Sequence, residues 1–191
     1  MDYYKKNAKE YIKSTINADM KDYYSMFLGY LNPASKILDI GFGSGRDSLY
    51  FSNLGYEVFS LDPIEEFCAY GRQLGLNNVV LGSIEEITYL EEFDGLWASA
   101  SLLHIKSNNL ISIFNKCYDA LKDNGVMFVS FKYGDFEGMV DERYFTYLTE
   151  QSFSSIINNT KFRIEKMWIN ESDKLNRDIK WLNAILIKEK E

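Results

Sequence analysis

Two hydrophobic patterns alternate along residues 36–132, and this alternation limits the possible folds more than any other feature of the sequence. Short apolar runs, typical of buried strands, are followed by stretches in which apolar residues recur at helical spacing. Strands that alternate with helices form right-handed βαβ units, so the sequence predicts a doubly wound, Rossmann-like α/β fold with a mostly parallel sheet. The expected strands cover residues 36–40, 57–62, 78–82, 93–101 and 126–132.

The C-terminal part of the chain breaks this rhythm. Residues 162–170 and 180–188 read as two successive strands joined by a charged loop, with no helix between them. Such a pair predicts an antiparallel hairpin added to the parallel sheet, which makes the expected sheet seven-stranded. We expect one domain over residues 1–191, divided into an N-terminal helical segment (1–32), the alternating core (36–132), a polar and aromatic insertion (133–148), and a C-terminal helix with the strand pair (149–191).

The charge and the residue counts argue against several classes of function. The chain has 191 residues and a formal net charge of −7, so a nucleic acid or an anionic membrane held by charge alone is not expected. Cys68 and Cys117 lie on apolar helical stripes and are expected to be buried, reduced thiols. The only histidine is His104, which excludes a multi-histidine metal site, and no metal is expected. No apolar run reaches the ~18 residues of a membrane span, and no signal-peptide pattern opens the chain, so the cytoplasm is the expected compartment.

A glycine-rich turn follows the first expected strand, in the stretch "KILDIGFGSGR". Glycines at 41, 43 and 45 allow a sharp bend and the close approach of a ligand, and a simple tight turn is the alternative. Ligands of doubly wound sheets bind outside the carboxyl ends of the strands, where this turn lies. The spacing differs from the dinucleotide fingerprint G-x-G-x-x-G, because the last position of that pattern falls on Arg46, which is too large for close helix–strand packing.

Two acidic residues flank this turn. Asp39 lies two residues before Gly41, where a carboxylate would repel a pyrophosphate but would suit an ammonium or sulfonium group. Asp62 ends the second expected strand, where it can accept hydrogen bonds from both hydroxyls of a ribose or can cap the next helix. Together the glycines and the two acids favour a nucleoside with a cationic amino-acid tail.

At this point the sequence resembles the class I S-adenosylmethionine-dependent methyltransferases. "ILDIGFGSGR" resembles their first motif, "VFSLDP" the ribose-binding strand and "LGSIEEI" the adenine segment, while "FDGLWASASLLHI" and "LKDNGVMFVSFKYG" are similar to the fourth and fifth strand motifs. The resemblance is greatest to a small bacterial branch described as tellurite-resistance-like. It implies S-adenosylmethionine as cofactor, a lid formed by residues 1–32, a cofactor-binding core over 36–132 and a substrate-side insertion over 133–148.

The resemblance also implies roles for individual residues on the cofactor side. Gly41 and Gly43 would lie under the methionine part, with Gly45 in the same cofactor-binding turn, and Asp39 would hold the ammonium group directly or through water. Of Ser99 and Ser101, one would lie near the same tail, Ser99 being the candidate chosen; that the two merely finish the strand is the alternative. Many relatives have Asp where this chain has Ser83, which weakens the adenine assignment, and Ser83 can instead cap a helix together with Glu86. The remaining cofactor residues implied are Tyr11 on the lid, Asp62 at the ribose, and Pro63, Ser83 and Ile84 at the adenine.

Other residues are candidates for the acceptor side. His104 follows the fourth strand, where the donor methyl group should emerge, and is either a general base or a structural histidine. Lys132 ends the fifth strand, and Arg143 and Tyr144 lie in the insertion that would cover the site, with Trp181 near them; ordinary solvated side chains are the alternative.

The sequence therefore predicts an enzyme that transfers the methyl group of S-adenosylmethionine to a small-molecule acceptor by in-line displacement. A second hypothesis is a non-catalytic sensor or partner protein that binds the same cofactor, and a third, a nicotinamide oxidoreductase, rests on the glycine-rich turn alone. The signature of enzymes that methylate nucleic-acid amines is missing, because "WASA" occupies its place.

Overall fold

The computed structural model describes residues 2–170 and 179–190. It contains the helices α1 (Asp2–Thr15), α2 (Lys21–Leu28), α3 (Arg46–Asn53), α4 (Glu65–Gln73), α5 (Ser107–Ala120) and α6 (Glu150–Ile157), with short 3-10 helices η1 (Ile84–Glu86) and η2 (Leu102–His104). Its strands are β1 (Lys36–Ile40), β2 (Glu57–Asp62), β3 (Asn78–Leu81), β4 (Phe93–Ala98), β5 (Leu121–Lys132), β6 (Glu137–Val140), β7 (Arg143–Thr146), β8 (Arg163–Asn170) and β9 (Trp181–Ile187).

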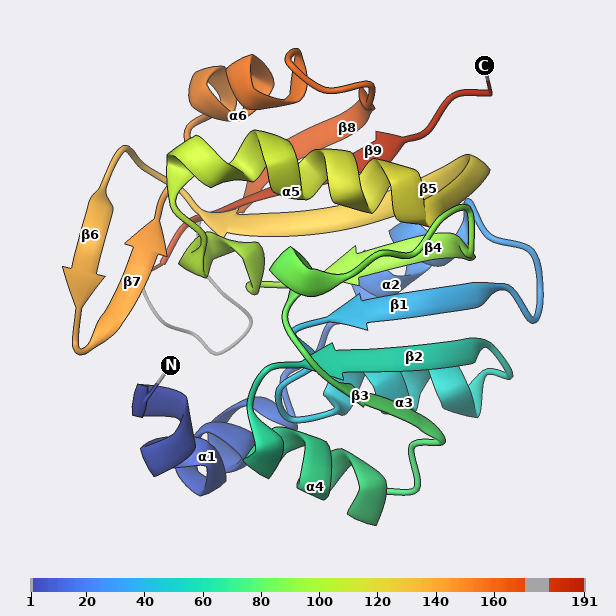
Figure 1. Cartoon of the computed structure of the whole chain (residues 1–191), viewed down its shortest axis with the longest axis vertical. Coiled ribbons are helices and arrows are strands. Elements are labelled where there is room, and N and C mark those ends of the chain that lie inside the picture. The colour runs from blue at the N-terminus through green and yellow to red at the C-terminus, as the bar shows by residue number, and fades with distance from the viewer. Residues whose placement is uncertain (1, 171–178, 191) are drawn as a thin grey trace.

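Seven of these strands form one sheet in the order β3-β2-β1-β4-β5-β9-β8 (Figure 1). The five N-terminal strands run parallel, whereas β9 is antiparallel to both β5 and β8. This confirms the predicted Rossmann-like sheet with an antiparallel strand pair at its C-terminal edge. The strand order reverses between β1 and β4, so the loops after these strands flank the crevice in which such sheets bind ligands.

Both faces of the sheet are covered, which explains why its central strands are apolar at nearly every position. In β1, Leu38 and Ile40 pack in the cluster that contains residues of α5 and α6. Ile37 of the same strand packs with Phe27 of α2 and Phe51 of α3 on the opposite face. Figure 1 shows α5 in front of the sheet and α2 and α3 behind it. Side chains of β1 therefore alternate between two cores, which decides below where Asp39 points.

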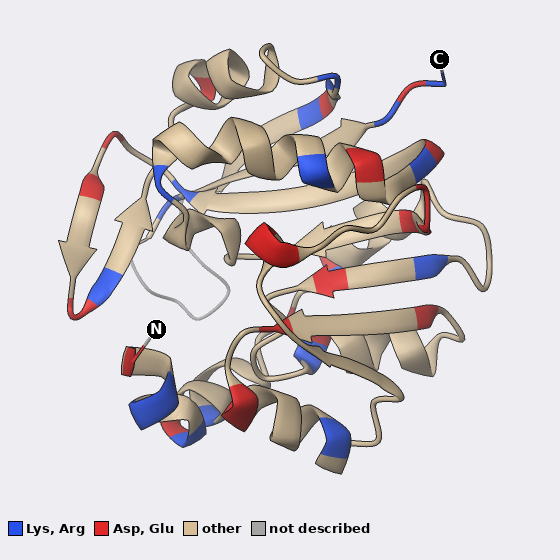
Figure 2. Cartoon of the chain, in the orientation of Figure 1, with Lys and Arg blue, Asp and Glu red and all other residues tan. Residues whose placement is uncertain are grey.

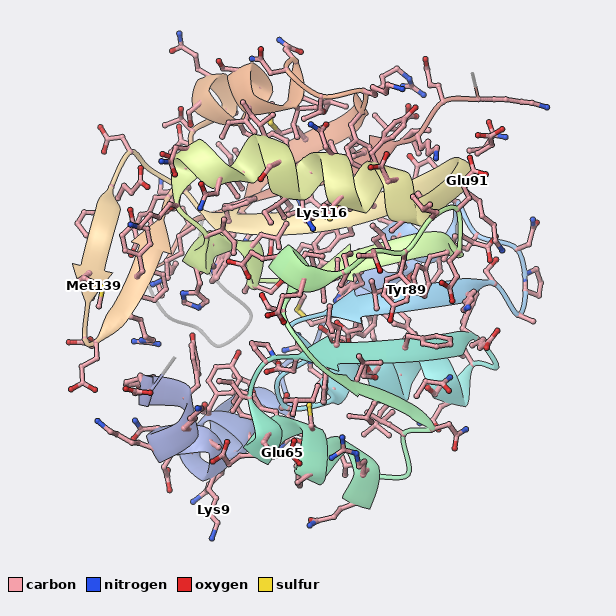
Figure 3. The ribbon with its side chains drawn as sticks, viewed as in Figure 1. Lys9, Glu65, Tyr89, Glu91, Lys116 and Met139 are labelled. Atoms are coloured by element: carbon pink, nitrogen blue, oxygen red, sulfur yellow. The ribbon has the colours of Figure 1, made fainter. Side chains whose placement is uncertain are left out.

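The N-terminal segment and the insertion differ from their expected form. Residues 3–31, expected to be helical, form two helices separated by the turn after Thr15. The insertion contains an antiparallel hairpin of β6 and β7, which the sequence did not suggest. Its two-residue turn places Asp141 and Glu142 at φ of 47° and 62°, a conformation that hairpin turns usually fill with Asn or Gly. Met139 of β6 projects outward and is 62% exposed (Figure 3).

Several smaller expectations also have an outcome. Cys68 and Cys117 are buried and unpaired, as expected. The charged loop expected between the last two strands lies largely outside the described residues. No helix in the described part of the chain is long and apolar enough to cross a membrane. Acidic and basic residues are interspersed along the ribbon (Figure 2).

Candidate active site

Two neighbouring cavities, of about 310 and 550 Å³, lie at the carboxyl ends of the parallel strands. The smaller cavity is lined by the loops after β1, β2 and β3, and the larger one by the ends of β4, β5 and β9 together with α1. Because several residues border both, the two cavities are neighbouring parts of one site. The shared residues are Tyr4, Tyr11, Gly41, Ala100, His104 and Arg143.

The glycine turn between β1 and α3 has a backbone that other residues would strain. Gly41, Gly43 and Gly45 have φ values of +70°, +53° and +76°. A Cβ atom on Gly41 would lie 2.6 Å from Cβ of Ser101, and one on Gly43 would lie 3.1 Å from the ring of Tyr11. Gly41 and Gly43 line the cavities, whereas Gly45 lines neither and is the N-cap residue of α3.

Asp62 is positioned by backbone groups at the wall of the smaller cavity. One carboxylate oxygen accepts from the N–H of Gly43 at 3.0 Å and the other from the N–H of Ile64 at 2.9 Å. Burial raises the pKa of Asp62 to about 6, although both N–H groups oppose the rise. Each oxygen retains a lone pair, so the carboxylate can accept hydrogen bonds from two adjacent hydroxyl groups.

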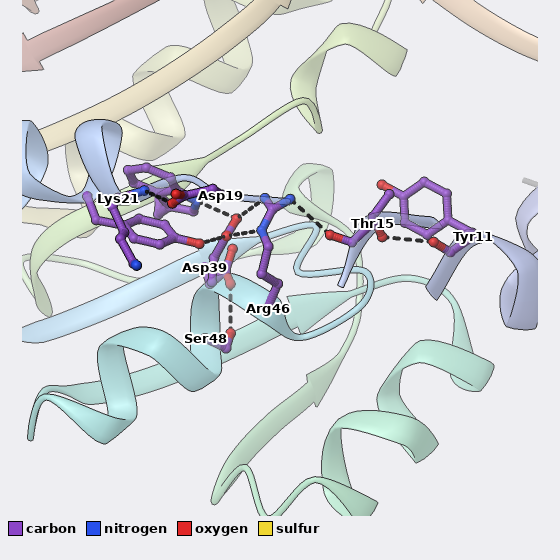
Figure 4. Close-up of polar contacts among 10 residues, drawn as sticks. Tyr11, Thr15, Asp19, Lys21, Asp39, Arg46 and Ser48 are labelled. Atoms are coloured by element: carbon purple, nitrogen blue, oxygen red, sulfur yellow. Dashed lines mark hydrogen bonds and ion pairs between the residues drawn. The ribbon is translucent and has the colours of Figure 1, made fainter. Parts of the chain in front are cut away.

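Asp39 has a different environment from Asp62. It is 2% exposed and accepts a hydrogen bond of 2.7 Å from Ser48 of α3, whose hydroxyl also contacts that of Ser60 (Figure 4). Burial, followed by the charge of Asp47, raises the pKa of Asp39 well above its usual range. The alternation of β1 turns Asp39 toward α3, and it lines neither cavity. The two acids therefore do not face one cavity, and a role of Asp39 at the cofactor stays a prediction.

Asp47, on the first turn of α3, forms a buried network at the wall of the larger cavity. It accepts from the Arg46 guanidinium at 2.6 and 2.9 Å, from the indole N–H of Trp97 at 2.8 Å, and from the hydroxyl of Tyr24. Burial acts to raise the pKa of Asp47, but Arg46 and the other donors hold it below its usual value. Arg46 also donates to the carbonyl of Thr15 at 3.3 Å, which ties α1 to the glycine turn (Figure 4).

His104 borders both cavities and is fixed by two hydrogen bonds. Its Nδ1 lies 2.7 Å from the carbonyl oxygen of Tyr144 and its Nε2 lies 2.7 Å from the hydroxyl of Tyr4. Since a carbonyl only accepts, Nδ1 carries the proton and Nε2 accepts from the phenol. Burial lowers the pKa of His104 to about 4, and the positive charges of Arg143 and Lys132 add to this effect. The imidazole is therefore neutral at neutral pH.

The N-terminal helix forms a wall of both cavities. The rings of Tyr4 and Tyr11 meet edge to face with centroids 5.3 Å apart, and Tyr11 lies 5.3 Å from the ring of Phe67. Burial raises the pKa of both phenols, so they are neutral donors at neutral pH. Tyr11 thus lies over Gly43 at the wall of both cavities, and its contact with the cofactor stays a prediction.

The adenine-side candidates gather in the smaller cavity and the acceptor-side candidates divide between the two. Ser83 caps η1, and its hydroxyl oxygen accepts from the N–H of Glu85 at 3.3 Å. The backbone N–H of Ser83 donates to the Glu86 carboxylate, which completes the expected capping box. The hydroxyl of Tyr144 is bonded to Glu137 at 2.7 Å, so this residue contributes its carbonyl to the site. Pro63, Ser83, Ile84 and Tyr144 line the smaller cavity, and Ser99, Lys132 and Trp181 line the larger one.

Several residues of the site were not selected from the sequence. Tyr4 fixes His104, but nothing in the N-terminal run of tyrosines distinguishes it from its neighbours. Ser101, weighed beside Ser99 but not chosen, lines the smaller cavity with a buried hydroxyl that has no hydrogen-bond partner among the described residues. The Arg46–Asp47 pair could have been noticed from its position directly after the glycine motif. The free Ser101 hydroxyl, the glycine cradle and Asp62 fit a nucleoside that brings its own hydroxyl and amine groups.

Comparison with known proteins supports a methyltransferase. Residues 38–129 match a family model described as a methyltransferase domain. An uncharacterized methyltransferase of Staphylococcus carnosus is 26% identical over 203 residues, which cover 97% of this chain and 98% of the relative. The probable S-adenosyl-L-methionine-dependent methyltransferase TehB of Haemophilus influenzae is 40% identical over 63 residues, which cover 33% of this chain and 20% of that protein.

A solved structure shares the fold over nearly the whole chain. The 1,6-didemethyltoxoflavin-N1-methyltransferase of Burkholderia thailandensis, with bound 1,6-didemethyltoxoflavin and S-adenosylhomocysteine, superposes with a TM-score of 0.77 and 19% identity. The match covers 94% of this chain and 81% of that protein. The matched domain and the relative that covers the whole chain are both methyltransferases, whereas the similarity to TehB extends over only a third of the chain.

Proposed function

We propose that this chain is a class I S-adenosylmethionine-dependent methyltransferase that methylates a small-molecule acceptor by in-line displacement. Its sheet order, its match to a methyltransferase domain and its methyltransferase relatives support this proposal. S-adenosylmethionine is the cofactor, as the sequence predicted. The observation that carries the proposal is the contact between the two cavities: the smaller one has the glycine turn and Asp62, and the larger one adjoins it at Tyr4, Tyr11 and His104.

The residues of the smaller cavity suit the nucleoside part of the cofactor. Asp62 would accept from the ribose hydroxyls, Ser101 would bond a polar atom, and Pro63 and Ile84 would flank the base. When bound, the cofactor supplies a methyl group on a sulfonium, so that the acceptor's lone pair forms the new bond while the electrons of the broken S–C bond stay on sulfur. The protein holds the acceptor in position and excludes water, contributions worth ~7–11 kcal/mol in well-oriented reactions.

His104 is the proposed proton acceptor for acceptors that must lose a proton. Its Nε2 already accepts from Tyr4, so a proton would reach it through the phenol, with Tyr4 taking the proton of the acceptor as it passes its own to Nε2. The pKa of about 4 makes His104 a weak base at neutral pH. A base this weak suits an acceptor atom that has a free lone pair for the attack and loses its proton only as the new bond to the methyl group makes that proton acidic. The Nδ1–H bond to Tyr144 keeps Nε2 directed at the phenol.

The sensor hypothesis is not favoured. A protein that only binds the cofactor needs no space for an acceptor, but here a cavity of about 550 Å³ adjoins the cofactor cavity. Its lining includes Lys132 and Trp181, which lie beyond the glycine turn. The assignment to the tellurite-resistance-like branch and the cytoplasmic location stay predictions.

Calorimetry tests the cofactor part of the proposal. We expect purified protein to bind S-adenosylmethionine and S-adenosylhomocysteine but not NAD, and Asp62→Asn to weaken binding while Glu66→Gln, an exposed acid of α4, leaves it unchanged. Binding of NAD without the sulfonium compound would instead identify an oxidoreductase. A turnover screen with labelled methyl donor over small thiols, amines, carboxylates and oxyanions tests catalysis, and the absence of transfer to any of them would favour the sensor.

A further inference from the structure

We propose that the larger cavity binds the acceptor through an oxyanion group, a carboxylate or a phosphate, held by Lys132, Arg143 and the indole N–H of Trp181. This inference rests on the proposed methyl transfer and adds the chemical class of its substrate. The three residues come from β5, β7 and β9, and all of them line the cavity of about 550 Å³.

Lys132 is a cation held in the cavity by aromatic rings instead of by an acid. Its ammonium lies 4.0 Å from the centroid of Phe145 and 5.2 Å from that of Tyr147, and it donates to the Tyr147 hydroxyl at 3.3 Å. No carboxylate in the described part of the chain forms an ion pair with it. Ring faces stabilise such a charge only in part, so its remaining donors are available to an anion.

Arg143 presents a second cation at the same wall. Its guanidinium lies over Tyr3 at 4.2 Å and over Phe145 at 5.2 Å, so both cations share the ring of Phe145. Its only ion pair among the described residues is with the exposed Asp141, at 4.0 Å. The Nε–H of Arg143 is buried and has no hydrogen-bond partner, although an unmade hydrogen bond of a buried charged group is costly.

Trp181 adds a neutral donor beside Lys132. The two residues are directly opposite each other in the antiparallel pair β5–β9, so their side chains lie on the same face of the sheet. The indole N–H of Trp181 is buried and has no hydrogen-bond partner among the described residues. In the described part of the chain, three donors of the cavity therefore await acceptor atoms: the ammonium of Lys132 in part, and the Nε–H of Arg143 and the indole N–H of Trp181 entirely.

The acids of this cavity do not neutralise the two cations. Among the described residues, only Asp47 and Glu10 contribute carboxylates to its lining. Asp47 is saturated by Arg46, Trp97 and Tyr24, and Glu10 is exposed at the rim. His104 is neutral, so the free charge at the inner wall is positive. An oxyanion supplies the missing charge and accepts charge-assisted hydrogen bonds from both cations.

This group is distinct from the carboxylate of the cofactor. The glycine turn follows β1, and β4 lies between β1 and β5 in the sheet. Lys132 of β5 and Trp181 of β9 therefore lie on strands that are separated from the glycine turn by β4. Arg46, in contrast, directly follows that turn. Saturating the protein with S-adenosylhomocysteine fills the cofactor part before the oxyanion part is probed.

The test is calorimetric titration of the protein saturated with S-adenosylhomocysteine, using inorganic phosphate and acetate as probes at low ionic strength. We expect at least one probe to bind and Lys132→Met or Arg143→Met to weaken it about tenfold to hundredfold, as for hydrogen bonds to charged groups. Lys106→Met is the matched control, because Lys106 is exposed, lies over the ring of Tyr144 at 5.9 Å and does not line the cavity. Far-UV circular dichroism and thermal melting confirm that each variant folds.

A second arm compares turnover of acceptor pairs that differ only in charge, such as a carboxylate and its primary amide. Preference for the carboxylate, lost in Lys132→Met but kept in Lys106→Met, supports the proposal. Failure of both probes to bind, or equal binding by all variants, overturns it, as does equal use of amide and carboxylate. If S-adenosylhomocysteine itself does not bind, the proposed function fails. The titration with S-adenosylhomocysteine, done before any oxyanion probe is added, shows this result by itself.

Discussion

His104 shows how one residue can be chemically defined by its neighbours. The carbonyl of Tyr144 fixes the proton on Nδ1, and the phenol of Tyr4 occupies Nε2. Burial then disfavours the charged form. The sequence could place this histidine beside the reacting methyl group but could not indicate its protonation state, because both hydrogen-bond partners come from distant parts of the chain.

Since the chain has a single histidine, its titration can be read without assignment. We expect ¹⁵N-detected NMR to show the Nδ1–H tautomer and a midpoint near pH 4, below the 6.5 of an unperturbed imidazole. The unfolded chain takes up this proton near pH 6.5 and the folded chain only near pH 4, so the free energy of unfolding should fall as the pH drops from 6.5 to about 4. A midpoint near 6.5, or the Nε2–H tautomer, would contradict the arrangement.

Asp62 should make cofactor binding pH-dependent. Its pKa is raised to about 6 by burial, and only the ionised carboxylate offers acceptors to two hydroxyls. The affinity for S-adenosylhomocysteine should therefore be constant above this pKa and fall as the pH drops below it, by up to about tenfold per pH unit. Calorimetry across this range measures the effect, and Asp62→Asn should bind weakly with a nearly flat profile.

At the scale of elements, the turn between β1 and α3 is where backbone conformation and site coincide. Gly41→Ala should destabilise the protein by more than about 2 kcal/mol, since it adds a left-handed alanine and a Cβ contact of 2.6 Å with Ser101. Gly55→Ala is the matched control, because Gly55 has φ +89° with no atom within 4 Å of the added Cβ and should cost about 1 kcal/mol. Urea unfolding gives both values, and equal costs would show that Ser101 moves freely aside.

The elements also show what the sequence could predict. Strands β1, β2, β4 and the second half of β5 were predictable because both of their faces are largely buried, which leaves apolar runs between clear turn signals. The β6–β7 hairpin was not, because its strands are short and its turn consists of Asp141 and Glu142 instead of Asn or Gly. Strand alternation in β1 already implied that the side chain of Asp39 points toward α3. The resemblance to the methyltransferase motif instead favoured a place at the cofactor.

At the scale of the whole molecule, the Asp47 network joins elements that are distant in the sequence. Tyr24 of α2, Arg46 of α3 and Trp97 of β4 all donate to one carboxylate. The partners meet only after the sheet and both helices have formed, so the network ties the cofactor loop to the stability of the fold. Sequence reasoning could not find it, because its members come from three separate patterns.

Asp47→Asn should therefore reduce the free energy of unfolding by about 3 kcal/mol, since breaking a buried ion pair leaves the charge of Arg46 uncompensated. Lys122→Met is the control, because it removes an ion pair of 2.9 Å between Lys122 and Asp94 in which the Lys122 side chain is 45% exposed. Loss of this exposed pair should cost less than about 1 kcal/mol. Chemical denaturation compares the two variants. Similar losses would mean that the other donors compensate for the lost carboxylate.

The unpartnered indole of Trp181 gives the molecule a built-in optical probe. Of the three tryptophans, Trp97 is fully buried and stacked on Phe128, and Trp168 stacks on Tyr23, so Trp181 is the one tryptophan that lines the larger cavity. Filling that space changes the polarity around its indole directly. Emission from the unlabelled protein, compared with Trp181→Phe, can thus follow acceptor entry in real time.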